Sequence, residues 1–435
     1  MGDKNNIPKI LFYCILLLLF VPMIQEEYHW VNVGELDGYD PSVTEAAVMS
    51  VDNWLSGAYQ VTKEGYRDRF FGFRNWTIRL NNQVKYNLYK ASEADNIVVG
   101  KDHYLYGIDY IDAYRGEDFV GENVVKAKVR RFKQLQDTLS KLGKHLFFVI
   151  TPNKADYFDA FLPTIYQGDR TGISTNYDSY IKHLKAENVN HIDVNEWFVN
   201  IKDTVSYPLF PQTGIHMTHY GSALFADSLI RYIEGLTQQD LPNFSWSKVA
   251  LSSEALEADA DAEKALNLIF KLPYFELPYP SVHIDQKGKY KPTALTIGDS
   301  FYWTFVSWGG LTDVFDDGQF WYYNREQHPG QRDVKTLDLE QEIKDKELIF
   351  IVNSAFNLWR FGFGFDLDLY KHFFGDEILK DEALLDLIVQ ERMKTALKDK
   401  AWMKSLRAHA LETGQEFEKV LYDNITYVVK KKLEK

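Results

Sequence analysis

The stretch PTALTIGDS, residues 292–300, decides the fold. Its apolar run, residues 293–297, is short and bounded by turn-forming residues, which is typical of a buried strand. The residues that follow, 301–308, are compatible with a helix. A serine at such a strand-to-helix junction lies at the carboxyl edge of a parallel sheet, where α/β folds bind their ligands. Ser300 is therefore placed as a nucleophile would be, although serine is also an ordinary helix-capping residue.

Other short apolar runs along the chain have the same character and are separated by stretches compatible with helices. They are residues 97–99, 144–151, 191–194, 319–324 and 347–353. Between the first two of these runs, residues 124–142 have helical periodicity. Strands that alternate with helices predict a parallel α/β sheet. We expect one doubly wound sheet.

Composition excludes several classes of protein. The 435 residues include 62 acidic and 49 basic side chains, which gives a formal net charge of −13, and 45% of the residues are apolar. The aromatic content of 15% excludes a disordered chain. The acidic balance argues against nucleic acid as a partner, since phosphate binding needs clustered Lys and Arg. The single cysteine, Cys14, excludes an internal disulfide framework and a Cys-based zinc site.

The beginning of the chain predicts a membrane segment. Residues 10–24 carry no charge, two lysines precede them, and Glu26 and Glu27 follow. This polarity predicts a helix with its amino end inside and the remainder of the chain outside. A cleaved signal peptide is the alternative, but residues 22–28 lack the small-residue cleavage pattern. An uncleaved anchor at the periplasmic or extracellular face of the membrane is favoured.

The remaining chain divides into an extension, a main domain and a tail. The acidic and then proline-rich residues 254–280 predict a surface insertion, a helix followed by a loop. The tail has helical periodicity and is expected to pack against the domain. The expected divisions are 1–28 for the anchor or signal, 29–95 for the extension, 96–375 for the α/β domain with its insertion at about 240–290, and 376–435 for the helical tail.

A serine needs a neighbouring base to act as a nucleophile. The polar loop of residues 210–221 precedes a predicted helix and contains His216 and His219. His216 is the candidate base, whereas His219 fits a solvated or capping side chain. A metal site would need a third ligand, which the spacing does not provide. We therefore expect no metal and no cofactor.

Five short blocks in a common order carry a resemblance to a known family. They are residues 74–76, 98–106, 150–154, the loop around His216, and residues 298–300. With these blocks the chain resembles the SGNH-hydrolase-like family of polysaccharide O-acetylation proteins, typified by the periplasmic alginate O-acetyltransferases. The histidine loop precedes the serine, as in that family and in the reverse of the order found in ordinary GDSL esterases.

The resemblance implies an SGNH-like, flavodoxin-like sheet in permuted order. It also implies that Ser300 is the nucleophile, that His216 is the general base, and that acyl transfer passes through an acetyl-serine intermediate. The implied partners are a polysaccharide acceptor and a membrane-embedded O-acyltransferase that supplies the acetyl group. Transfer to a sugar and hydrolysis by water share the same acyl-enzyme.

One departure from the family pattern concerns the third catalytic residue. The family usually has an aspartate two residues before the histidine, and this chain has Gly214 there. Asp193 and Asp299 are the candidate acids, and a Ser–His dyad is the other option. Loss of the orienting acid costs a serine protease about 10⁴ in turnover. The alternative function is therefore a catalytically inactive polysaccharide-binding or scaffold subunit.

Further candidates concern the oxyanion and the substrate. The backbone N–H of Phe301 lies at the start of the predicted helix, where it favours negative charge. In related hydrolases an asparagine after the third strand completes the oxyanion hole, which points to Asn353 and, as second choice, Asn324. Aromatic rings stack on sugar faces, so Trp359 and Tyr323 are the candidate substrate-binding residues.

Overall fold

A mixed seven-stranded sheet forms the centre of the computed structural model, which describes residues 6–38, 48–168, 170–380, 382–397 and 399–433. The strand order is β10-β9-β8-β7-β11-β3-β4. Five neighbouring strands from β8 to β4 are parallel, while β9 and β10 extend the sheet in antiparallel fashion. The strands are β3 (His145–Thr151), β4 (His191–Asp193), β7 (Ala294–Gly298), β8 (Gly318–Tyr322), β9 (Glu326–His328), β10 (Arg332–Asp333) and β11 (Leu348–Ser354).

Helices cover both faces of this sheet. In β3, Phe148 and Ile150 join the core on one face and Phe147 and Val149 join the core on the other. Every residue of β11 is buried. A strand buried on both faces reads as a continuous apolar run, which explains why these strands were predicted from the sequence. The first core includes α6 (Glu122–Lys141) and α8 (Asn176–Ala186), and the second includes α5 (Ile108–Arg115), α9 (Val194–Ile201), α10 (His219–Thr237) and α12 (Trp303–Ser307).

The strand predicted at residues 97–99 forms, but its predicted place in the main sheet is wrong. β1 (Ile97–Val99) pairs in antiparallel fashion with β2 (Leu105–Gly107) in a separate two-stranded sheet. The tight turn through Lys101–His103 returns the chain at once. An antiparallel pair needs only such a short connection, whereas a parallel strand would need a crossover.

The insertion contains the expected helix followed by a loop, and these lie between two strands that were not predicted. Its main feature is a two-stranded antiparallel sheet of β5 (Asn243–Ser252) and β6 (Leu277–Asp285). A 3₁₀ turn (Glu257–Ala260) and the short helix α11 (Asp261–Ala265) lie between the two strands. Phe244 of β5 packs against Phe305 of α12 with ring centroids 5.4 Å apart. The insertion is therefore attached to the elements that follow β7.

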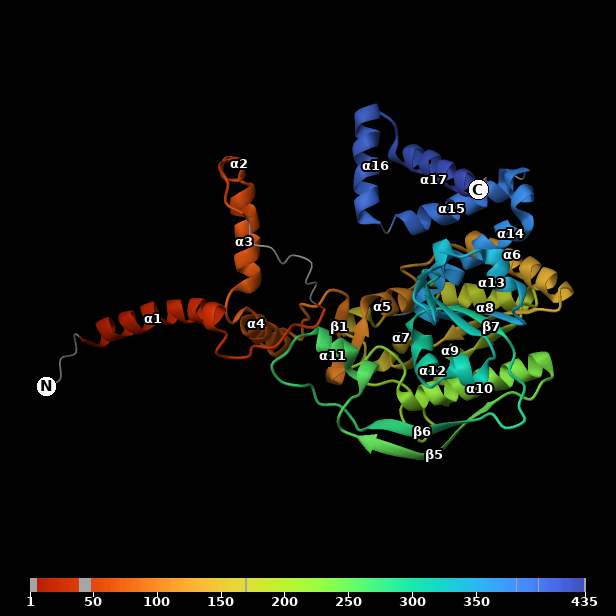
Figure 1. Cartoon of the computed structure of the whole chain (residues 1–435), viewed down its shortest axis with the longest axis horizontal. Helices are drawn as coiled ribbons and strands as arrows, with labels where there is room; N and C mark the ends of the chain where they lie inside the picture. Colours follow the sequence, from red (N-terminus) through yellow and green to blue (C-terminus); the bar gives the residue numbers. More distant parts are fainter. Residues whose placement is uncertain (1–5, 39–47, 169, 381, 398, 434–435) are drawn as a thin grey trace.

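Four helices follow the sheet at the carboxyl end of the chain and stand beside it in Figure 1. Ile388, Leu406 and Leu421 are buried in the same core as one face of the sheet, as predicted. The helices are α14 (Phe365–Lys380), α15 (Glu382–Ala396), α16 (Lys400–Thr413) and α17 (Phe417–Leu433), and the short α7 (Lys154–Tyr157) and α13 (Leu339–Lys344) lie within the domain.

The amino-terminal helices are α1 (Asn6–Tyr28), α2 (Val51–Leu55), α3 (Ala58–Phe70) and α4 (Arg74–Tyr89). Figure 1 shows α1 extending away from the α/β domain. Within the described part of the chain, residues 7–28 form the one helix that is long and apolar enough to cross a membrane. Its side chains are largely exposed, so α1 is not a core helix of the domain.

Candidate active site

Ser300 lies directly beyond the carboxyl end of β7. The strand ends at Gly298, and Asp299 begins a short 3₁₀ turn that leads into α12. Since β3, β7, β8 and β11 run parallel and in register, the residues that follow them meet at one edge of the sheet. Ser300 is partly exposed at this edge.

His216 reaches this serine from the loop between α9 and α10. Its Nε2 atom lies 2.8 Å from Ser300 Oγ, and its Nδ1 atom lies 2.7 Å from Asp261 Oδ2. An ionised carboxylate can only accept, so Nδ1 carries the hydrogen and donates it to Asp261. In the neutral imidazole Nε2 then accepts the hydroxyl hydrogen of Ser300. The three side chains form one continuous hydrogen-bonded chain.

Asp261 is held in place by the backbone around it. Its Oδ1 atom accepts hydrogen bonds from the N–H groups of Ile215 at 2.9 Å and Ala262 at 2.7 Å. One carboxylate oxygen therefore binds the loop that carries His216, while the other orients the imidazole. This acid lies in the insertion, 45 residues after the histidine, and it was not among the candidates predicted from the sequence.

The geometry around Gly214 explains why the acid comes from elsewhere. A Cβ atom at this position would lie 2.5 Å from the carbonyl oxygen of Ala258 and 2.6 Å from that of Asp259. These distances are too short for any side chain, so the insertion occupies the space that an aspartate would need. The glycine and the relocated carboxylate are two parts of the same arrangement. The sequence signal available was the acidic run at residues 257–263, which was interpreted as surface.

Neither of the two acids suggested by sequence position contacts His216. Asp193 caps α9 by accepting from the N–H of Glu196, and it also accepts from the hydroxyl of Tyr177 at 2.8 Å. Asp299 is fully buried and accepts from the N–H of Ser354 at 2.8 Å. Burial raises the pKa of Asp299, and the hydrogen bonds from Ser354 and Phe301 oppose that rise. Asp299 thus joins β7 to β11 beneath the serine.

Lys154 fixes the same histidine loop from the other side. Its ammonium group donates to the carbonyl oxygens of Gln212 at 2.8 Å and Gly214 at 2.6 Å, and its side chain is completely buried. Burial lowers the pKa of Lys154 well below its ordinary value, while the negative charge of Asp261 opposes that shift. The lysine follows β3, so this loop is tied to a central strand.

The oxyanion candidates use their donors within the protein. The N–H of Phe301 donates to Asp299 Oδ1 at 3.2 Å. Asn353 donates through Nδ2 to the carbonyl of Ser354 at 3.3 Å and accepts the N–H of Gly362 at 3.2 Å. The second choice, Asn324, donates to Asp368 at 3.0 Å. The oxyanion assignment therefore stays a prediction that these contacts do not favour.

A pocket of about 230 Å³ opens beside Ser300. His216, Ser300 and Phe301 line it together with Trp303 and Thr304 of the following helix. His219 lies just beyond, with Nδ1 3.3 Å from Asp259 Oδ2 and its ring in an edge contact with Tyr279. Among the described residues there is no cluster of three or more His, Cys, Asp or Glu side chains arranged to hold a metal ion.

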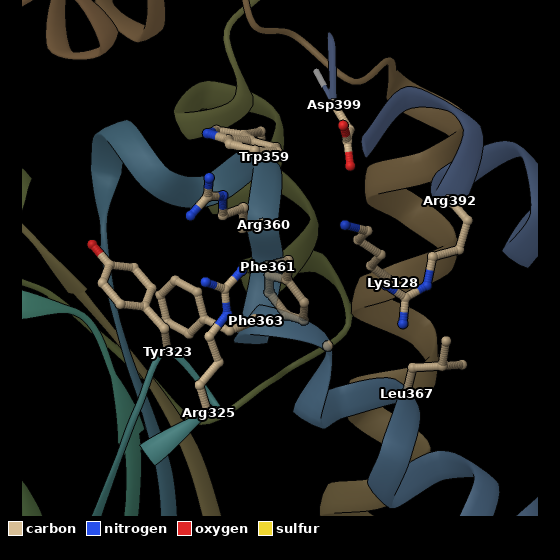
Figure 2. A pocket seen from close by; sticks show the side chains of 11 residues that line it. Lys128, Tyr323, Arg325, Trp359, Arg360, Phe361, Phe363, Leu367, Arg392 and Asp399 are labelled. Carbon is tan, nitrogen blue, oxygen red and sulfur yellow. The ribbon is translucent and has the colours of Figure 1, made fainter. Parts of the chain in front are cut away.

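A second pocket, of about 350 Å³, contains both predicted substrate-binding residues (Figure 2). Tyr323 follows β8, and Trp359 lies in the 3₁₀ segment Ala355–Gly364 that follows β11. The guanidinium of Arg360 lies 4.3 Å from the ring centroid of Trp359. The charged side chains that line the pocket are Lys128, Arg325, Arg360, Arg392 and Asp399.

One buried asparagine links Tyr323 of the second pocket to Asp299, the residue before Ser300. Asn357 donates to Asp299 Oδ2 at 3.3 Å and is also hydrogen-bonded to Tyr323. Burial and the negative charge of Asp299 raise the pKa of Tyr323 to about 12, so its hydroxyl stays protonated at neutral pH. The cationic, aromatic pocket is thereby joined to the residue that precedes Ser300.

The parallel sheet, the serine after its strand and the histidine loop agree with an SGNH hydrolase-like fold. Residues 97–262 match the family model described as the SGNH hydrolase-like domain of the acetyltransferase AlgX. This match confirms the predicted resemblance. The matched segment includes His216 and Asp261 and ends before Ser300.

Three solved structures are similar at low identity. The O-acetyltransferase domain of Pseudomonas putida AlgJ is 14% identical, with a TM-score of 0.42, over 64% of this chain and 99% of that one. Pseudomonas aeruginosa AlgX is 13% identical, with a TM-score of 0.38, over 62% of this chain and 64% of that one. Bacillus cereus PatB1 with a sulfonyl adduct is 14% identical, with a TM-score of 0.40, over 62% and 96%. No curated protein matches the chain.

Proposed function

We propose that this protein is an O-acetyltransferase or esterase that acts on an extracellular or cell-envelope polysaccharide through an acyl-Ser300 intermediate. The observation that carries the proposal is the hydrogen-bonded chain from Asp261 through His216 to Ser300. The match of residues 97–262 to an acetyltransferase family model supports the same class of reaction.

In the first half-reaction, Nε2 of His216 takes the hydroxyl proton as Ser300 Oγ attacks the carbonyl carbon of an acetyl ester. The tetrahedral intermediate collapses when the bond to the donor's oxygen breaks, and His216 returns the proton to that oxygen. Acetyl-Ser300 and the free donor alcohol remain. Asp261 stabilises the imidazolium that forms in between, because its carboxylate accepts the Nδ1 hydrogen.

In the second half-reaction, an acceptor hydroxyl gives its proton to His216 and attacks the acetyl carbon. The bond to Ser300 Oγ breaks, and the proton returns to the serine. A sugar hydroxyl as acceptor makes the protein a transferase, and water makes it an esterase. The pocket beside Ser300 has room for a group of this size, and Trp303 forms part of its wall.

The polysaccharide is proposed to lie across the second pocket. Trp359 offers a ring for stacking on a sugar face, and the cationic side chains around it suit a sugar that carries a negative group. The hydrogen-bonded link from Tyr323 through Asn357 to Asp299 holds this pocket in a fixed position relative to Ser300.

The proposal places the domain outside the membrane, held there by α1. The length and apolar character of residues 7–28 support an anchor, and the charge pattern around them supports the outward orientation. A membrane-embedded O-acyltransferase is the proposed source of the acetyl group.

A chromogenic acetyl ester and intact-protein mass spectrometry test the proposal. The expected result is acetylation of Ser300 and turnover that Ser300→Ala and His216→Ala abolish. Ser245→Ala and His283→Ala are matched controls, because both residues are exposed in the two-stranded sheet of the insertion. Equal turnover by the four variants and the unmodified protein would refute the catalytic assignment.

The alternative is a catalytically inactive subunit that binds polysaccharide or scaffolds a modification complex. Its main support was the glycine at position 214, and the hydrogen bond between Asp261 and Nδ1 of His216 weakens that support. Retained binding of oligosaccharides without any acyl-enzyme would favour this alternative.

A further inference from the structure

The helix α4 (Arg74–Tyr89) has its polar face inward and its apolar face outward. The buried residues of α4 are Asn82, Gln83 and Tyr86. Asn82 donates to the carbonyl of Leu266 at 2.9 Å, Gln83 accepts the N–H of Phe270 at 3.0 Å, and the Tyr86 hydroxyl lies 2.5 Å from Nδ1 of His103. A surface helix of a soluble domain normally buries its apolar stripe instead.

The outward face carries a continuous apolar stripe. Trp76, Leu80, Val84 and Leu88 are 50%, 54%, 45% and 68% exposed. Each lies four residues after the one before it, so they follow one line along the helix, about 18 Å long at 1.5 Å per residue. Thr77, Asn81 and Asn87 flank the stripe and are also exposed.

The stripe starts where the apolar helix α1 (Asn6–Tyr28) ends. Gly72, two residues before α4, packs so closely that an added Cβ would lie 2.0 Å from the carbonyl oxygen of Pro22 and 2.9 Å from Cβ of Gln25. Tyr28 and Trp30 at the same end of α1 are 74% and 59% exposed. Tyrosine and tryptophan are enriched at the boundary between membrane and water. The start of α4 is thus fixed at the level where α1 would leave a bilayer.

The charges of α4 agree with this position. Its sequence, RNWTIRLNNQVKYNLY, contains three basic residues and no acidic one. Arg79 donates to the carbonyl oxygens of Val33 and Glu35, which keeps this cation beside the segment that follows α1. A basic helix with tryptophan and leucine on its exposed face has the composition of a helix that lies in a membrane interface.

We propose that α4 is a second membrane contact, a helix that lies in the headgroup layer with Trp76, Leu80, Val84 and Leu88 turned toward the acyl chains. This inference rests on the proposed insertion of α1, and it adds that the domain is held at a fixed height and orientation rather than on a free tether. We assign the bilayer as the partner of this stripe because the stripe begins beside the end of the apolar helix α1, where Tyr28 and Trp30 are also exposed.

The test uses the full chain in vesicles of phosphatidylethanolamine and phosphatidylglycerol, with no other protein present. Cys14→Ser removes the one native thiol, and an environment-sensitive fluorophore is attached at Val84→Cys, at Leu17→Cys within α1, or at Leu411→Cys on the exposed side of α16. We expect a blue-shifted emission at positions 84 and 17, quenching by nitroxide-labelled lipids, and protection from aqueous iodide. Position 411 should show the opposite behaviour.

A second variant tests whether the membrane contact depends on the stripe rather than on a fluorophore placed at position 84. With the fluorophore at Leu80→Cys, the change Val84→Asp should restore quenching by iodide, because a charge on the stripe is expelled from the acyl boundary. If the fluorophore at position 17 is in lipid and the one at position 84 is in water, the membrane contact of α4 is wrong and the α1 anchor stands. If the fluorophore at position 17 is in water, both the α1 anchor and the α4 contact are wrong. Protection of position 84 only after other membrane proteins are added would replace the bilayer by a protein partner.

Discussion

Asp261 lies 2.7 Å from Nδ1 of His216 although it belongs to an insertion that separates the histidine loop from β7. Its other oxygen binds the N–H of Ile215, so the same carboxylate shapes the loop and orients the ring. The insertion is therefore part of the proposed active site, because it supplies the acid that contacts His216.

The substitution Asp261→Asn tests this relationship directly. The amide keeps the size of the side chain but can present an N–H toward Nδ1, which would favour the wrong tautomer of His216. By comparison with serine proteases we expect turnover of an acetyl ester to fall by about 10⁴. Steady-state kinetics measure the effect, with Asp285→Asn at the exposed end of β6 as the matched control. A loss of less than tenfold would count against the role of Asp261.

Introducing an aspartate at position 214 should not restore the activity of the Asp261→Asn variant. Because a Cβ there meets two carbonyl oxygens at 2.5 and 2.6 Å, Gly214→Asp must displace residues 258–259 and with them Asp261. We expect Gly214→Ala alone to lower the free energy of unfolding by about 1–3 kcal/mol, the usual cost of overpacking. Urea denaturation gives this number, and a gain of activity in the Gly214→Asp, Asp261→Asn double variant would contradict the steric argument.

Lys154→Met should affect both stability and catalysis. The substitution keeps the length of the side chain but leaves the carbonyl of Gly214 without its lysine donor and that of Gln212 with only the N–H of Leu105, which costs about 1–3 kcal/mol. The freed loop carries His216, so we also expect a fall in kcat that exceeds any change in KM. Exposed Lys287→Met in the turn after β6 serves as the control. Unchanged kcat together with lowered stability would limit Lys154 to a structural role.

Asp156 should make stability depend on pH. Burial raises its pKa from 3.8 to about 6, and Arg170 opposes the rise. The folded state therefore holds the proton more tightly than the unfolded chain, so stability is greatest below about pH 4 for this group and declines as pH rises through 6. The decline is at most about 3 kcal/mol at 1.36 kcal/mol per pKa unit. Denaturation of Asp156→Asn and the unmodified protein at several pH values isolates the effect, and parallel stability curves would disprove it.

Trp359→Ala should weaken use of a polysaccharide acceptor. Removing one stacking ring is expected to cost about 1.4 kcal/mol, or tenfold in KM for the acceptor. Acetyl transfer to oligosaccharides of graded length and charge measures this change. Trp246→Ala on β5 is the control for loss of a tryptophan outside the pocket. An equal KM for Trp359→Ala and the unmodified protein would move the acceptor path elsewhere.

The central strands could be predicted because their information is local. Residues 144–151 and 347–353 are short apolar runs, and burial on both faces of a parallel sheet requires just such runs. Residues 97–99 look the same in sequence, yet their pairing with β2 depends on the turn that follows them, which hydrophobicity does not reveal.

The candidate site divides in the same way. Ser300 and His216 stand next to recognisable strand and helix boundaries, so their placement could be anticipated. Asp261 could not, since its role depends on a long-range fold of the insertion against Gly214.

The strand order also has a consequence for biogenesis. Residues 145–151 of β3 pair with residues 348–354 of β11, which leave the ribosome much later. Until then β3 has an open edge of unpaired N–H and C=O groups, and such an edge invites aggregation. The histidine and its acid likewise emerge before the serine. The first half of the chain therefore exposes an unpaired strand edge during synthesis, and the side chains of the candidate site come together only after β11 has been made.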